Sequence, residues 1–198
     1  MKKHQILKKP SAWQISLLAS IVLLLLFSAC FEIETVEQPP CTLTYGSFIP
    51  EVSIIFTDSD GNYYYPYFGI KLPDGWTVED SIHLVDDTFS PLWVDTLATI
   101  AYQDSLVQKM DSIDPPGEGY YWWVGCGIDT LLYQDLQYYT YHMYPIIHTE
   151  GETGDFFLDY MAGSNAEGEW GSINWARYDS VPISVHIPDT LWVTSCAN

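Results

Sequence analysis

The order of apolar and polar residues after residue 41 predicts a domain built almost entirely from β-strands. Short alternating or wholly apolar runs are separated by Pro, Gly, Asp and Asn, which end strands and form turns. The clearest alternation places Ile183, Val185 and Ile187 on one buried face. This spacing is typical of an all-β domain. The expected strands are 42–48, 52–57, 63–72, 76–78, 81–85, 120–126, 137–144, 146–148, 155–162, 173–178, 181–187 and 191–194.

Two local signals refine the early strands. Asp60 and Gly61 lie between two β-prone runs and predict a hairpin, because Gly accepts the positive φ of a tight turn. Pro66, inside the second run, predicts an edge strand or a bulge, because proline cannot donate a ladder hydrogen bond.

The run 120–126 is apolar at both alternating sets of positions. A strand of this kind is buried on both faces, as central strands are. Of Trp122 and Trp123, we therefore expect one to face the core and the other to lie under a covering loop or helix. In the later strand 155–162, Phe157 and Tyr160 are the expected core anchors, and the glycine-rich stretch 163–171 predicts an exposed loop.

One helix interrupts this pattern. Apolar residues between 97 and 113 recur at helical spacing, and the Pro115-Pro116-Gly117 sequence ends the run. We predict a short helix over 99–112, packed across one end of the sandwich, with an inserted strand pair as the alternative.

The segment from Gly69 to Val78, with sequence GIKLPDGWTV, resembles the step of strand, proline, glycine, tryptophan and strand found in immunoglobulin-like modules of secreted bacterial proteins. The resemblance implies an antiparallel β-sandwich in which a tight turn places Trp76 at the edge of the core. It implies no activity.

The first thirty residues have a different character. A basic head, residues 2–9, precedes an apolar run over 17–27, which is the layout of a secretory signal. The run ends in Phe27, Ser28, Ala29 and Cys30, and this ending resembles the lipobox of bacterial lipoproteins, with Phe27 where the family usually has Leu. The resemblance implies cleavage before Cys30 and acylation of that cysteine. A plain cleaved signal and an uncleaved anchor are the alternatives.

These features predict three parts: a signal peptide over 1–29, a lipidated N-terminus and solvated tether over 30–41, and one β-sandwich domain over 42–198. After Cys30 there are three basic residues and 26 acidic ones, so the formal charge is −23. Such a chain is repelled by phosphate, which argues against nucleic acid as a partner and leaves the lipid on Cys30 to contact the bilayer. The expected location is the bacterial cell envelope, at the outer membrane or cell surface.

Cysteines outside the lipobox are found at positions 41, 126 and 196. An exported protein meets an oxidising compartment, and chain ends often lie close together, so we favour a disulfide between Cys41 and Cys196. No bridge at all is the alternative. Cys126 lies in the apolar run 120–126 and is expected to be a buried small hydrophobe.

The chain contains no recognisable catalytic motif: there is no Gly-x-Ser-x-Gly elbow, no phosphate-binding glycine loop and no His-Glu-x-x-His. Paired carboxylates carry little information among so many acidic residues. Asp58, Asp60 and Asn62 alternate as calcium ligands often do, but the EF-hand glycine and glutamate are missing, so we favour a plain turn over a calcium site. No metal or other cofactor is predicted, and His142 and His148 are expected to be ordinary rim histidines.

Aromatic clusters are the strongest functional candidates. We weigh their usual role of filling and capping the core above a displayed face for stacking sugars or protein surfaces. The candidate ligand-binding residues on such a face are Tyr63, Tyr65, Tyr121, Trp122, Tyr139 and Tyr141. We therefore predict a lipid-anchored, non-catalytic binding or structural module for glycan or protein ligands. The alternative is a carbohydrate-active enzyme or accessory subunit with acidic residues around an aromatic cleft.

Overall fold

The computed structural model describes residues 31–56, 63–86, 96–128, 131–132, 139–165, 174–188 and 196. The lipobox-like segment, the Asp58–Asn62 turn, most of the glycine-rich stretch and the expected strand 191–194 lie outside these ranges. The described part contains one helix, α2 (Asp104–Ile113). Its strands are β1 (Phe31–Glu37), β2 (Cys41–Leu43), β3 (Ser47–Phe48), β4 (Glu51–Phe56), β5 (Tyr63–Pro73), β6 (Thr77–Val78), β7 (Ser81–Asp86), β8 (Thr96–Tyr102), β9 (Tyr120–Gly127), β10 (Leu131–Leu132), β11 (Tyr139–Met143), β12 (Ile147–His148), β13 (Gly154–Asn165) and β14 (Asn174–His186).

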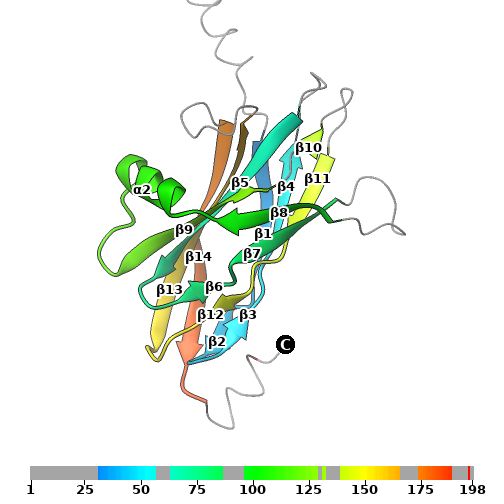
Figure 1. Ribbon diagram of the computed structural model, residues 1–198. Helices are drawn as coiled ribbons and strands as arrows, with labels where there is room; N and C mark the ends of the chain where they lie inside the picture. Colours follow the sequence, from blue (N-terminus) through cyan, green and yellow to red (C-terminus); the bar gives the residue numbers. More distant parts are fainter. Residues whose placement is uncertain are drawn as a thin grey trace, which may run out of the picture.

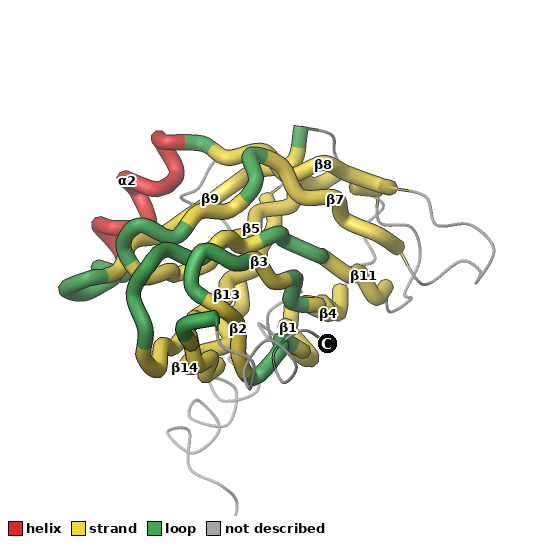
Figure 2. The backbone as a smooth tube through the Cα atoms, turned by 90° about the horizontal axis from the view of Figure 1, so that it is seen from below, coloured by secondary structure: helices red, strands yellow, loops and turns green. Residues whose placement is uncertain are grey.

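Most strands belong to one large sheet, which runs in the order β1-β4-β11-β7-β8-β9-β5-β13-β14-β2, with β10 paired to β5. A small second sheet, β3-β12-β6, lies at one end of it (Figure 1). The large sheet curls round, so that β1 returns to lie beside β14 (Figure 2). The two halves of the curled sheet thereby face each other across a common core, as the layers of a sandwich do.

The main core fills the space between these halves with side chains from nearly every strand. Its largest fully buried members are Trp76, Tyr160 and Phe68. Where β1 meets β14, Gln38 closes the seam: its amide nitrogen donates to the carbonyl oxygen of Pro182 at 2.9 Å, and its amide oxygen accepts from the Tyr160 hydroxyl at 2.6 Å. Burial raises the pKa of Tyr160, so this phenol stays neutral as a donor.

The predicted fold class, an all-β sandwich with one short inserted helix, is confirmed. One pairing departs from the antiparallel pattern, since β2 and β14 run parallel, with Thr42 opposite Val185.

The prediction of a solvated tether after Cys30 is wrong over residues 31–37. These residues form β1, which pairs antiparallel with β4 from Phe31 opposite Phe56 to Glu37 opposite Glu51. The charged residues hid the pattern, but Ile33 points into the core while its neighbours Glu32 and Glu34 are exposed, which is ordinary strand alternation.

The prediction that the strands on either side of Asp60 and Gly61 pair as a hairpin is wrong for the described residues. Strand β4 pairs with β1 and β11, whereas β5 pairs with β9, β13 and β10. An Asp-Gly pair favours a tight turn locally, but partner choice follows burial across the whole sheet. Nor is Pro66 on an edge strand: β5 lies between β9 and β13, although its pairing with β9 starts only at Tyr67, after the proline.

Strand β9 behaves as predicted. Trp123 joins the core between the two halves of the sheet, and Trp122 faces the other way, into a second apolar cluster beneath α2. Leu106 and Met110 of α2 pack over this cluster, so the helix covers the outer face of β9. Figure 2 shows α2 outside the curled sheet. The expected position of the helix, across one end of the sandwich, is therefore wrong.

The first part of the predicted helix, residues 99–102, is instead the end of a strand. Residues 96–102 form β8, paired with β7 and β9, and α2 starts only at Asp104. Ile100 fits a buried strand position as well as a helical one, because short apolar runs do not separate the two periods. In β13, Tyr160 is a core anchor as expected, but Phe157 is 50% exposed.

The turn before Trp76 has the predicted form. Gly75 has φ +86, a left-handed conformation that glycine adopts without strain, and the Trp76 amide donates to the carbonyl oxygen of Pro73 at 3.2 Å. The turn delivers the Trp76 ring into the core, 6.0 Å from Phe48 and 5.2 Å from Phe156 between ring centroids.

Cys41 and Cys196 form a disulfide, which confirms the predicted pairing. It joins β2, near the start of the domain, to a residue 155 positions later. Cys126 is free and buried, also as predicted. The helix of the described residues, α2, is not long and apolar enough to cross a bilayer.

Candidate functional site

The six aromatic residues predicted for a binding face come from three strands. Tyr63 and Tyr65 are on β5, Tyr121 and Trp122 are on β9, and Tyr139 and Tyr141 are on β11. The side chains of Tyr63 and Tyr139 are outside the described part of the structure.

The remaining four do not share one displayed face. Trp122 is fully buried under α2, and Tyr141 is buried in the main core. Tyr65 packs at the edge of the cluster beneath α2, and Tyr121 is half-buried against the main core. The curl of the sheet and the covering helix therefore turn most of the expected face inward, which corrects the prediction for Trp122 and Tyr141.

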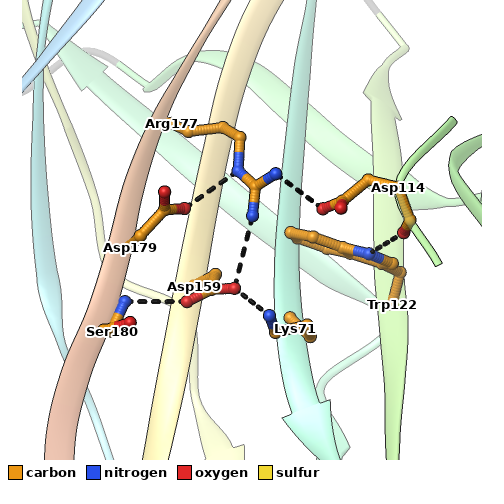
Figure 3. Close-up of polar contacts among 7 residues, drawn as sticks. All are labelled: Lys71, Asp114, Trp122, Asp159, Arg177, Asp179 and Ser180. Carbon is orange, nitrogen blue, oxygen red and sulfur yellow. Dashed lines mark hydrogen bonds and ion pairs between the residues drawn. The ribbon is translucent and has the colours of Figure 1, made fainter. Parts of the chain in front are cut away.

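A polar cluster surrounds the buried Trp122 on the outer face of the sheet (Figure 3). At its centre is Asp159, whose side chain is only 5% exposed. One carboxylate oxygen forms ion pairs with Lys71 and, at 3.4 Å, with Arg177, and the other accepts from the Ser180 amide at 2.7 Å. Four neighbouring elements, β5, β9, β13 and β14, thus meet at this point.

Arg177 extends the polar cluster to α2. Its guanidinium lies 2.7 Å from a carboxylate oxygen of Asp114, directly after the helix, and donates at 2.9 Å to Asp179. The Trp122 indole donates to the Asp114 carbonyl at 2.9 Å. Both cations also lie over the Trp122 ring, with Lys71 Nζ at 5.9 Å and Arg177 Cζ at 5.8 Å from the centroid.

This polar cluster fastens the helix and the strands together. Asp159 also occupies an irregular place in the β13–β14 pairing, where Leu158 faces Val181 but Tyr160 faces Tyr178. Its bond to Ser180, which has φ +61, holds that bulge. Lys71 and Arg177 are two of the three basic residues after Cys30, and both are engaged by carboxylates. We assign the polar cluster a structural role.

A groove opens beside Tyr121, where the small sheet meets β8 and β9. It has a volume of about 170 Å³ and is lined by Thr77, Val78, Asp80, Tyr102, Tyr121 and Trp123. Its walls are fixed: the Tyr102 amide donates to the Asp80 carbonyl at 3.1 Å, and the Tyr121 hydroxyl donates to the Trp76 carbonyl at 2.5 Å. Tyr102 is 38% exposed, and its ring lies 5.8 Å from the Trp123 ring between centroids.

The phenols of the groove sit in a negative electrostatic environment. Burial, followed by the neighbouring Tyr102 and Asp74, raises the pKa of Tyr121 to about 12. The pKa of Tyr102 is also raised, first by burial and then by the hydrogen bond and charge of Asp104 and the charge of Asp111. In this groove a predicted ligand-binding residue, Tyr121, borders open space together with an exposed aromatic ring, Tyr102, and a carboxylate, Asp80.

The raised pKa of Tyr121 predicts sensitivity to alkali. Folding holds its proton more tightly than the unfolded chain, whose phenol titrates near the ordinary value of 10.0. The stabilisation is therefore complete below pH 10 and is lost as pH rises through about 12. We expect the urea midpoint to fall between pH 9 and pH 11, and to fall less in Tyr121→Phe. An equal decline in both proteins would contradict the assignment.

The candidate metal residues do not converge. His142 Nδ1 lies 2.9 Å from a Glu51 carboxylate oxygen and 3.1 Å from the Ser53 hydroxyl, and His148 is exposed on β12. The described residues hold no group of three His, Cys, Asp or Glu side chains placed to bind a metal ion. The calcium-type residues Asp58, Asp60 and Asn62 are outside the described ranges.

No known protein family and no curated protein matches this sequence. Among solved structures, the chain is similar to AvmM, described as catalysing macrocyclization in alchivemycin A biosynthesis, with 15% identity, a TM-score of 0.38, and coverage of 81% of this chain and 94% of that one. It is also similar to a 35 kDa C-terminal fragment of the major pilin GBS80 of Streptococcus agalactiae, with 10% identity, a TM-score of 0.41, and coverage of 80% of this chain and 55% of that fragment. Likenesses this distant carry no argument about function.

Sequence reasoning found Tyr121 but missed the rest of the groove. Tyr102 is inside the predicted helix but ends β8, and Asp80 falls between two expected strands, where no role is predicted for it. The usable signal was an acidic residue directly before one strand and an aromatic residue at the end of the next. This becomes informative only once β7 and β8 are known to pair.

Proposed function

We propose that the protein is a lipoprotein of the bacterial cell envelope, anchored through acylated Cys30, whose mature domain is a non-catalytic binding or structural module. The observation that carries the proposal is the Cys41–Cys196 disulfide. Disulfides of this structural kind persist in oxidising compartments and are rare in the cytosol. The disulfide supports export, and the lipobox-like residues 27–30 supply the means of retention at the membrane.

The arrangement of charged groups supports a non-catalytic role. Of the residues that line the groove, Asp80 is the single carboxylate, whereas glycoside hydrolysis ordinarily needs two carboxyl groups across the scissile bond. The buried carboxylate Asp159 is held by Lys71 and Arg177 in the polar cluster and is not presented to a substrate.

The anchor is tested by Cys30→Ser. Serine cannot be acylated through a thioether, so we expect the variant to leave the membrane fraction and become soluble in the envelope or medium. Several acyl chains hold a protein firmly, at about 0.8 kcal/mol per buried methylene, so release should be nearly complete. Membrane fractionation and mass spectrometry of the mature N-terminus give the readout.

Cys126→Ala is the matched control for this test, because it removes a buried free cysteine and leaves the lipobox intact. It should remain in the membrane fraction. A native N-terminus that carries no lipid would refute the anchor, and so would continued attachment of a Cys30→Ser protein from which residues 1–29 have been removed.

A further inference from the structure

We propose that the groove formed by Thr77, Val78, Asp80, Tyr102, Tyr121 and Trp123 binds the alkylammonium group of a small organic cation. This inference rests on the proposed binding function and names the chemistry of its ligand.

Three of the six residues that line the groove are aromatic. The rings of Tyr102 and Trp123 lie 5.8 Å apart, inclined by 41°, and Tyr121 borders the same space. A cation is attracted to an aromatic face within about 6 Å of its centroid, so an ammonium group in the groove can contact the exposed ring of Tyr102, which packs against the largely buried ring of Trp123. The same chain already uses this contact, since Lys71 and Arg177 both lie over Trp122.

The negative charges around the groove favour a positively charged ligand. Asp80 is in the lining, and Asp104 and Asp111 act on the Tyr102 phenol from α2. The negative charge of Asp74 likewise acts on Tyr121, whose pKa it raises. Two of the three basic residues after Cys30 are held in the polar cluster, and the third, Lys109, is on the exposed side of α2. A cation gains from this field, and an anion is repelled.

Size and polarity favour an organic cation over a glycan. The volume of about 170 Å³ is below the roughly 300 to 1,000 Å³ of sites that enclose drug-sized ligands. A sugar also needs several directed hydrogen bonds, but the Tyr121 hydroxyl is already bonded to the Trp76 carbonyl. The polar side chains left to the groove are Asp80, Thr77 and the Tyr102 phenol, which is bonded to Asp104. An alkylammonium group needs aromatic faces and a nearby carboxylate, and both are present.

The test is a titration of the full chain, purified in a polyoxyethylene detergent so that neither choline nor sugar is introduced. Choline chloride is the probe, followed by NMR chemical shifts or calorimetry, with an expected dissociation constant on the order of millimolar. The neutral isostere 3,3-dimethylbutan-1-ol should bind at least about fivefold more weakly, because it lacks the charge. Equal binding of the two, stronger binding of methyl glucoside, or no binding of choline would each overturn the proposal.

Variants localise the site. Tyr102→Leu should weaken choline binding at least about fivefold, and Tyr102→Phe should retain it, because the ring face is kept. Asp80→Asn should weaken binding about threefold at low salt. Tyr45→Leu, which removes a highly exposed ring outside the groove, is the matched control and should change nothing. Near-UV circular dichroism checks each fold, and equal affinities of Tyr102→Leu and Tyr102→Phe would place the site elsewhere.

The two proposals fail separately. Loss of choline binding with intact membrane attachment would remove this inference and leave the anchored module in place. Membrane attachment of a Cys30→Ser protein that has lost residues 1–29 would refute the anchor and leave the proposed groove chemistry unaffected.

Discussion

Reduction of the Cys41–Cys196 disulfide is expected to lower the free energy of unfolding by about 5 kcal/mol in the chain-entropy model, because the bond closes a loop of 155 residues. The unfolded chain gains most of this freedom, so the urea m-value should rise as the midpoint falls. Because domains are stabilised by only about 5 to 15 kcal/mol, a loss of this size leaves the reduced protein marginal.

Urea denaturation of one preparation with and without dithiothreitol measures this effect. Cys126 is the internal control, because it is a free thiol in both samples. The Cys41→Ser, Cys196→Ser double variant should match the reduced protein and should no longer respond to reductant. A change below about 1 kcal/mol in both experiments would show that the bond adds little to the native state.

Asp159→Asn is expected to destabilise the domain by about 3 kcal/mol, since removing one member of a buried ion pair leaves the other charge uncompensated. The ammonium of Lys71 would lose its carboxylate partner, while Arg177 would keep Asp114 and Asp179. The asparagine oxygen can still accept a hydrogen bond from the Ser180 amide, so the bulge is kept. The loss of stability should therefore come from the missing negative charge.

Asp179→Asn is the matched control for Asp159→Asn. It is the same chemical change on a carboxylate paired with the same arginine, but the Asp179 side chain is 58% exposed. An exposed pair contributes about 0 to 1 kcal/mol, so this variant should be close to wild type. Equal costs for the two variants would mean that burial does not set the strength of the polar cluster. A double-mutant cycle with Lys71→Met gives the coupling energy of the Lys71–Asp159 pair directly.

Success and failure of the sequence predictions follow from how local each signal is. The double-sided apolar run of β9 predicted both a core tryptophan and a covered one, because burial on two faces needs two packed layers. The turn at Gly75 and the burial of Ile183 and Val185 were predicted correctly, since each depends on a few neighbouring residues. Ile187, predicted on the same buried face, is 66% exposed and follows the end of β14.

The sequence did not show which strands pair with each other in the sheet. The β4–β5 hairpin failed because both strands find partners far along the chain. Phe157 is exposed while Leu158 and Tyr160 are buried, as strand alternation requires, so the prediction that Phe157 and Tyr160 both anchor the core went against the two-residue period. The bulge at Ser180 shifts the pairing of β13 with β14. A two-residue sequence period carries no record of such shifts.

The candidate site was the least predictable part. Its tyrosine on β9 was chosen for being aromatic, but the groove depends on β8 pairing with β7, so that Tyr102 lies opposite Asp80. The strand assignment at 96–102 was the step that sequence periodicity could not supply.

The position of β1 has a consequence for how the proposed lipoprotein stands on a bilayer. A ten-residue extended spacer would let the body swing within about 30 Å of the head groups. Here the first paired residue, Phe31, follows Cys30 directly, about 3.8 Å along the backbone. Acyl chains on Cys30 would therefore attach the bilayer almost directly to the first strand of the large sheet. The domain would then have a restricted tilt relative to the bilayer, and its membrane-distal end would carry the Cys41–Cys196 disulfide and the small sheet.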